Sequence, residues 1–132
     1  MDYGDISMNI LKIVLTAALF VATSTWAGDL TGPQKNAVQS AKQYLSMMGF
    51  SRSGLIHQLS SDVGDGYKIS DATVAVDSLN IDWNQEAVKS AKQYLNMMGF
   101  SCKGLINQLS SSAGDNYTVD QATYGAKQAG GC

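Results

Sequence analysis

The sequence predicts an all-α protein built from two tandem, three-helix repeats of the helix-turn-helix kind. Three observations predict this fold. The second half of the chain repeats the first, apolar residues inside each copy recur at helical spacing, and Ser or Gly stands where helices would begin or end. Sequence periods of 20–50 residues are typical of repeat architectures. The composition, 45% apolar and 15% charged, is that of a chain with a packed core.

The first element is a predicted secretory signal peptide at residues 1–27, cleaved between Ala27 and Gly28. Lys12 precedes an apolar run at residues 13–22, and small residues lead up to the cleavage point. This is the three-part layout of an export signal. Because residues 1–7 carry two Asp, translation is also compatible with a start at Met8.

After export the apolar run is either removed with the signal peptide or retained as a membrane anchor. A membrane span needs about 20 apolar residues and this run is shorter, which argues against an anchor. No Cys lies near the cleavage point, so the lipid-attachment pattern of bacterial lipoproteins is not present. We therefore expect cleavage, no stable membrane anchor afterwards, and a periplasmic or envelope-associated protein.

The first repeat is predicted at residues 28–81 and the second at 82–132. The segment AVQSAKQYL at 37–45 returns as AVKSAKQYL at 87–95, an offset of 50 residues from Ala37 to Ala87. The blocks MMGFS, GLI and QLSS follow in both copies without a gap. Each copy therefore folds the same way.

Three helices are predicted in each copy. The first carries an apolar stripe and stops at Gly49, and Ser51 caps a short second helix. A turn-forming segment at 62–68 follows, after which Ser70 caps the third helix. The apolar positions of the three stripes are Ala37, Ala41, Tyr44, Leu45 and Met48; Leu55, Ile56 and Leu59; and Ala72, Ala75, Val76 and Leu79.

Equivalent side chains of the two copies should form the core. A single copy is too small to be stable without help, so the copies should pack on each other. Trp83 stands at the joint and is predicted to fill the core between the repeats, with a surface-binding role as the alternative. The other predicted core residues are Tyr44, Phe50, Leu55 and Leu59 in the first copy and Tyr94, Phe100, Leu105 and Leu109 in the second.

Catalysis and metal binding have no support in the sequence. The single His57 is replaced by Asn107 in the second copy, which favours an exposed position over a catalytic one. The Asp-containing loops lack the closing Glu of a calcium loop and are interpreted as turns. We expect no enzyme activity and no catalytic, cofactor or metal site.

Nucleic acid is also an unsuitable partner. The net charge is −2, the pI is about 5.1, and basic residues are scattered singly along the chain. Phosphate binding needs clustered Lys and Arg. This argues against a cytoplasmic DNA-binding regulator, despite the helix-turn-helix outline.

The two cysteines predict a disulfide. Cys102 takes the place of Arg52 in the second copy, and Cys132 follows the flexible Gly130-Gly131. An even cysteine count in an exported protein favours pairing, so we expect an intramolecular Cys102–Cys132 bond in a monomer. The alternative is that Cys132 pairs with another chain.

The repeated motifs carry a family resemblance. The pattern SAKxYL, then FSxxGLIxQL, then Tyr before an Ala-rich helix, with Asp82-Trp83 at the joint, resembles the Ltp-type host cell surface-exposed lipoproteins. The resemblance implies tandem helix-turn-helix repeats outside a bacterial membrane. It also implies superinfection exclusion, in which a resident prophage or plasmid protein keeps the DNA of an incoming phage out of the cytoplasm, in the best-known member by engaging the phage tape measure protein.

The sequence is compatible with two functions. The first is an exported exclusion protein that binds a phage injection component, such as the tape measure protein, or an inner-membrane protein. The second is a structural or accessory envelope protein that binds peptidoglycan or a membrane protein. Both act by binding and need no cofactor.

Overall fold

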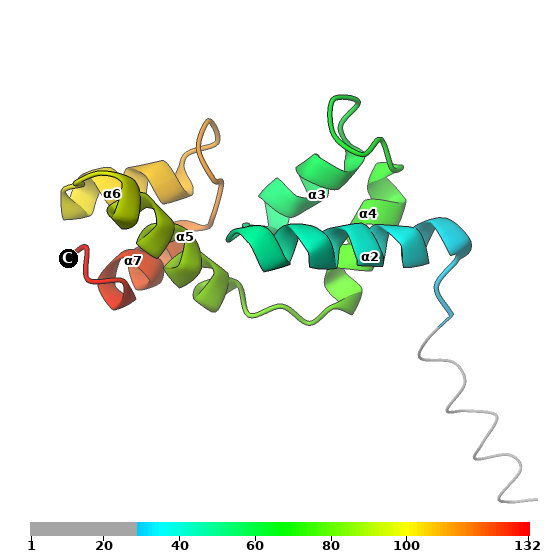
Figure 1. Cartoon of the computed structure of the whole chain (residues 1–132), viewed down its shortest axis with the longest axis horizontal. Coiled ribbons are helices and arrows are strands. Elements are labelled where there is room, and N and C mark those ends of the chain that lie inside the picture. Colours follow the sequence, from blue (N-terminus) through cyan, green and yellow to red (C-terminus); the bar gives the residue numbers. More distant parts are fainter. Residues whose placement is uncertain (1–28) are drawn as a thin grey trace, which may run out of the picture. The chain divides into compact units, whose positions relative to one another are not determined.

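The computed structural model describes residues 29–132. The predicted signal peptide, with Ala27 and Gly28 at its cleavage point, lies outside the described residues. Residues Thr31–Cys132 form one compact unit. It contains six helices and, among the described residues, no strand (Figure 1). They are α2 (Gly32–Met47), α3 (Arg52–Ser60), α4 (Ile69–Ser78), α5 (Trp83–Met97), α6 (Cys102–Ser110) and α7 (Val119–Gln128).

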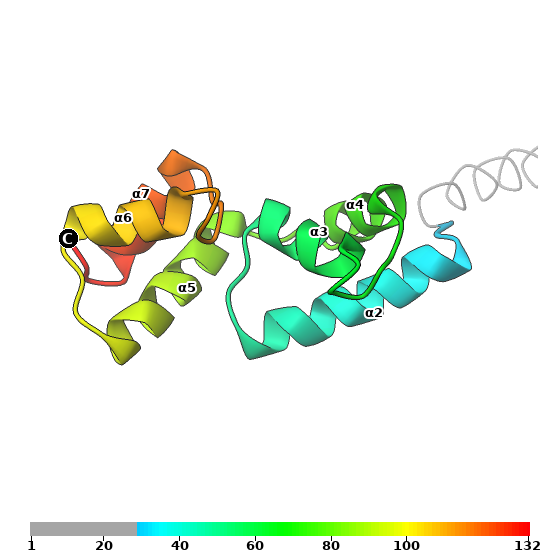
Figure 2. The same ribbon diagram turned by 90° about the horizontal axis from the view of Figure 1, so that it is seen from above.

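The helices form two groups of three. In the first repeat α4 packs against both α2 and α3, and in the second α7 packs against both α5 and α6. Figure 2 shows the groups in chain order, α2 to α4 in cyan and green and α5 to α7 in yellow-green to red. The prediction of an all-α fold with two tandem three-helix repeats is confirmed.

Polar caps start most of the helices. The Ser51 hydroxyl accepts the Gly54 N–H at 2.9 Å, and the Ser101 hydroxyl accepts the Gly104 N–H at 3.0 Å. Thr118 begins α7 with a capping box. These caps satisfy backbone donors that the first turn of a helix leaves unpaired.

The predicted Ser70 cap is wrong. Helix α4 begins at Ile69, its N-cap residue is Lys68, and no side chain caps it. Because α7 begins at the equivalent position with Thr118, the fold fixes the start of the third helix in both copies. Packing of α4 against α2 and α3 therefore outweighs the missing local cap.

The centre of each repeat consists of alanine and leucine. Each core is formed by side chains that are almost wholly buried: Ala41, Leu55, Ile56, Leu59, Ala72 and Val76 in the first, and Ala87, Ala91, Leu105, Leu109, Tyr117, Ala122 and Ala126 in the second. The four predicted leucines Leu55, Leu59, Leu105 and Leu109 are fully buried.

The predicted aromatic core residues are only half-buried, which is a departure from expectation. Tyr44, Phe50, Tyr94, Phe100 and Trp83 pack against the cores from their edges. The Tyr–Phe pairs stack edge-to-face, with ring centroids 5.8 Å apart in the first repeat and 5.7 Å in the second.

Close approach of the helices explains the displaced rings. Gly125 on α7 lies so near Ala87 on α5 that a Cβ at Gly125 would be 2.6 Å from the Ala87 carbonyl carbon. Helices that approach through Ala and Gly leave no space for a ring between them. The buried aromatic residue is instead Tyr117, whose hydroxyl shares a 2.7 Å hydrogen bond with the Ser90 hydroxyl.

Candidate functional site

The candidate site lies within the unit Thr31–Cys132, where the turn after α2 meets α5. The Gly49 N–H donates to Gln93 Oε1 at 3.0 Å, and the Phe50 N–H donates to Glu86 Oε1 at 3.2 Å. The turn is thus held by side chains of the next repeat. Glu86 and Gln93 leave α5 on the same face, at positions i and i+7 of the helix.

Two further hydrogen bonds complete this junction. The Lys89 ammonium group donates to the Leu45 carbonyl, and the Ser51 hydroxyl donates to the Asp115 carbonyl. The same Ser51 hydroxyl caps α3. Because Ser51 lies between the two repeats, the residue is only 2% exposed. Polar groups therefore hold the two repeats together where the sequence predicted an apolar core.

Gly49 allows this close approach. A Cβ at Gly49 would lie 2.3 Å from Ser90 Oγ, 2.7 Å from the Ser90 backbone nitrogen and 2.8 Å from the Glu86 carbonyl oxygen. Two of these three atoms belong to the backbone of α5. Gly49 stands directly past the end of α2, as predicted, since the helix ends at Met47 and Met48 is its C-cap. The close approach to α5 is a second reason for glycine at this position.

Burial at the junction affects two carboxyl groups. Burial raises the pKa of Glu86, although the hydrogen bond from the Phe50 N–H acts in the opposite direction. Burial also raises the pKa of Asp115, which accepts the Tyr94 hydroxyl at 2.8 Å. Glu86 thus accepts the backbone of the turn after α2, and Asp115 accepts a tyrosine hydroxyl of α5.

A mainly apolar cavity of about 480 Å³ opens beside the junction. Its lining residues are Met47, Met48, Gly49, Ser90, Gln93, Tyr94, Asn96, Met97 and Asp115. The three lining methionines are well exposed, 65% for Met47, 49% for Met48 and 71% for Met97. Flexible thioether side chains fill irregular gaps and suit surfaces that adapt to a partner.

The sequence did not reveal this surface. The repeated MMGF block was interpreted as the end of a buried stripe and a helix stop. A signal was nevertheless present, because Met47 lies off the apolar stripe of the first helix, which runs through Tyr44, Leu45 and Met48. Met97 repeats this placement in the second copy.

Trp83 connects the two repeats. It is the first residue of α5, after the Asp82 side chain that caps the helix by accepting the Gln85 N–H at 3.2 Å. Its half-buried ring packs against the core of the first repeat. Trp83 thus lies at the predicted joint but at the edge of one core.

The residues considered for catalysis and metal binding stay apart. His57 is exposed on α3 and lines a small polar cavity of about 320 Å³ with serine, glycine and asparagine residues. Asp65 and Asp115 accept the hydroxyls of Tyr44 and Tyr94. Among residues 29–132, no group of three or more His, Cys, Asp or Glu is placed to hold a metal ion.

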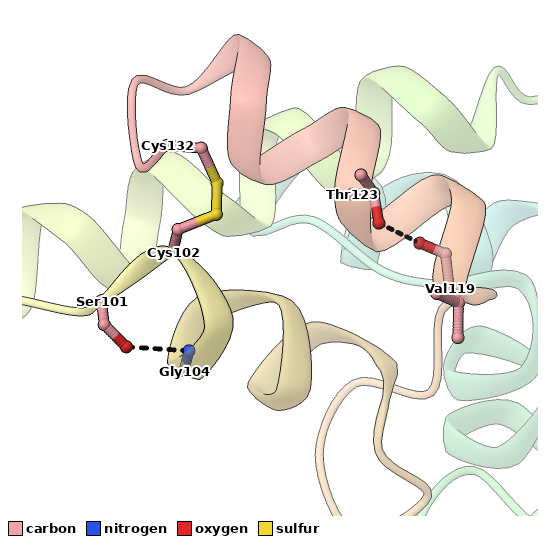
Figure 3. The surroundings of a disulfide bond; sticks show 6 residues. All are labelled: Ser101, Cys102, Gly104, Val119, Thr123 and Cys132. Carbon is pink, nitrogen blue, oxygen red and sulfur yellow. Dashed lines mark hydrogen bonds between the residues drawn. A yellow bond between two sulfur atoms is a disulfide. The ribbon is translucent and has the colours of Figure 1, made fainter.

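The structure joins Cys102 and Cys132 in an intramolecular disulfide (Figure 3). Their Cα atoms are 4.7 Å apart. The bond ties the tail after α7 to the first residue of α6, next to the Ser101 cap. At the equivalent place in the first repeat, Arg52 forms an ion pair with Asp77 at 2.7 Å.

None of the helices in the described part of the chain is both long and apolar enough to cross a membrane. A comparison with curated proteins finds no match. Among solved structures, the chain is similar to Ltp, a superinfection exclusion protein from the Streptococcus thermophilus temperate phage TP-J34. The two share 32% sequence identity with a TM-score of 0.67, over 75% of this chain and 97% of that chain.

The two repeats also match a family model, that of the host cell surface-exposed lipoproteins. The matches cover residues 33–79 and 82–128 and so coincide with the two groups of helices. Because these two consecutive matches span well over half of the sequence, the chain belongs to the host cell surface-exposed lipoprotein family.

Proposed function

We propose that this chain is an exported, prophage-type superinfection-exclusion protein. It keeps the DNA of an incoming phage out of the cell by binding a phage injection component such as the tape measure protein. The observation that carries the proposal is the likeness to the solved chain of a phage superinfection exclusion protein, which extends over 97% of that chain. Family membership in both repeats supports it.

The proposed binding surface is the methionine-lined cavity at the junction. Its apolar lining suits an apolar side chain of a protein partner, and its polar margin, formed by Gln93 and Asn96, can hydrogen-bond to that partner. Partner binding at this cavity needs no catalytic residue. The proposed function depends on the shape of the cavity and on its contacts with the partner.

The proposed domain organisation is compatible with this function. We propose a signal peptide at 1–27, repeat domains at 28–81 and 82–132, and a mature protein in the periplasm or bound to the cell envelope. Phage DNA that reaches the cytoplasm and any protein injected with it must cross the cell envelope. A protein placed there can intercept it.

The test is expression of the chain in a phage-sensitive host, with adsorption and arrival of phage DNA in the cytoplasm measured separately. Exclusion requires normal adsorption together with blocked DNA transfer. Met47→Ser combined with Met97→Ser should weaken exclusion, because it removes apolar contact area from the cavity.

Val63→Ser is the matched control, since Val63 is 97% exposed and does not line the cavity. It should exclude phage as well as the unaltered chain. Unhindered phage DNA transfer in cells that export the intact chain would contradict the exclusion function. Altered envelope properties in those cells would then support the accessory envelope role.

A further inference from the structure

The second repeat carries an unoccupied copy of the edge by which the first repeat holds α5. We call residues 45–51 and 95–101 the docking edges. Their sequences, LSMMGFS and LNMMGFS, differ at one position. In the first docking edge, the Leu45 carbonyl, the Gly49 and Phe50 N–H groups and the Ser51 hydroxyl all bond to the second repeat.

The docking edge of the second repeat has the same groups without these contacts. A Cβ at Gly99 would meet nothing within 4 Å, whereas one at Gly49 would collide with α5. Ser101 is exposed, whereas Ser51 is buried. Among residues 29–132, the Gly99 and Phe100 N–H groups have no hydrogen-bond acceptor. Gly99 is also outside the left-handed region, so its own backbone does not require glycine.

The groups that fill the first docking edge form a row on α5. Glu86, Lys89, Ser90 and Gln93 stand at positions i, i+3, i+4 and i+7, which places them on one face of the helix. Glu86 and Gln93 accept the two N–H groups, Lys89 donates to the carbonyl, and Ser90 lies against Gly49.

Helix α2 presents an equivalent row. Asn36, Gln39, Ser40 and Gln43 occupy the same four positions in the first repeat. Asn36 and Gln43 can accept N–H groups through their amide oxygens, and Gln39 can donate to a carbonyl. The side chains of Asn36, Gln39 and Gln43 are exposed. The backbone carbonyl of Asp65 corresponds to that of Asp115, the acceptor for the docking-edge serine.

We propose that the docking edge of the second repeat binds α2 of a second copy of this chain, as the first docking edge binds α5. The contact is head-to-tail, so each added copy leaves another docking edge open and the assembly can lengthen. This goes beyond the exclusion role and replaces the monomer expected from the sequence.

The association is weak for two structural reasons. Trp83 packs on the first repeat, but its equivalent in α2 is Pro33, which offers no aromatic ring. The short covalent connection between the repeats also raises the effective concentration of α5 at the first docking edge, and a second copy has no such connection. Copies therefore associate where they are concentrated, as in a confined envelope compartment.

The first experiment is sedimentation equilibrium of the full exported chain, with its disulfide intact, from roughly 10 µM to 1 mM, where weak complexes form. The average mass should rise with concentration. Gly99→Ala should keep the chain monomeric, because an added Cβ would meet Ser40 and the α2 backbone as it would meet Ser90 at Gly49. Val63→Ser is the control, since Val63 is 97% exposed and lies outside α2 and both docking edges.

Two further variants keep the result interpretable. Gln43→Ala removes an exposed acceptor and should weaken association several-fold. Asn36→Glu with Gln39→Lys gives α2 the row of α5 and should tighten association on the order of tenfold, unless Gly99→Ala is also present. An unaltered chain that stays monomeric throughout would overturn the proposal. Association that persists unchanged in Gly99→Ala would show that a different surface is used.

Discussion

Gly49→Ala tests whether the repeats are held by a backbone contact. The added Cβ would lie 2.3 to 2.8 Å from three atoms of α5, two of them backbone. Overpacking of this kind costs about 1–3 kcal/mol. Separation of the turn from α5 also weakens the Gly49–Gln93 and Phe50–Glu86 hydrogen bonds, each worth about 0.5–1.5 kcal/mol. We expect a loss of about 2–4 kcal/mol in the free energy of unfolding.

The assay is thermal and urea unfolding followed by far-UV circular dichroism in dilute solution. For a domain of about 100 residues, the expected loss corresponds to a fall in Tm of about 10 °C or more. Gly99→Ala is the matched control and should change stability by less than about 0.5 kcal/mol, because nothing lies within 4 Å of its added Cβ. Equal stability of the two variants would refute the close contact between the turn and α5.

Three other changes test other parts of the fold. Replacement of both Cys102 and Cys132 by Ser should lower the free energy of unfolding by about 3–4 kcal/mol, measured by urea unfolding, because the bond closes a loop across a separation of 30 residues; a loss under about 1 kcal/mol would contradict it. Lys68→Thr should raise stability by about 1 kcal/mol, since it gives α4 the cap that Thr118 gives α7; no gain in Tm would show that the cap does not form. Burial raises the pKa of Asp115, so its ionised form destabilises the fold as pH rises through that pKa. Asp115→Asn should therefore be the more stable protein at pH 7 and lose this advantage below about pH 3.9, and a stability difference that is independent of pH would count against the reasoning.

Local sequence signals predicted the helices well. Ser51 and Ser101 mark helix starts by side-chain chemistry that acts within three residues, so no tertiary information is needed. The leucines Leu55 and Leu59 follow the helical period and are buried as that period requires. The constant offset between the copies then extended each assignment to the second repeat.

Side-chain placement at the edges was not predictable in this way. Recurrence at equivalent positions suggested that Phe50 and Phe100 are central, but helices that approach through Ala and Gly leave rings at the margin. The start of α4 at Ile69 depends on packing against two other helices. The requirement for glycine at position 49 arises from α5, more than 30 residues away in the sequence. Such features depend on how distant segments meet.

Arg52 and Cys102 show that the two copies use different interactions to attach the second helix to the segment that follows it. Both residues begin the second helix of their repeat. Arg52 reaches Asp77 on α4 in a half-exposed ion pair, an interaction of about 0–1 kcal/mol. Beyond α4 the chain is also held by Trp83, whose ring packs on the first core. The segment after α7 has no such ring, and the disulfide to Cys132 holds it instead.

The disulfide also fixes where that segment lies. Gly131 packs so closely on the second core that a Cβ would lie 2.6 Å from Leu105 Cδ2, and its N–H donates to the Ala126 carbonyl at 2.8 Å. The tail thus covers Leu105, whose burial stabilises the second repeat. The disulfide joins the tail to the start of α6 and so holds the tail over Leu105. It leaves the docking edge uncovered, since the Gly99 and Phe100 N–H groups have no acceptor among residues 29–132. The second repeat is therefore closed over its core and open at its docking edge, which is the combination that binding of a further helix requires.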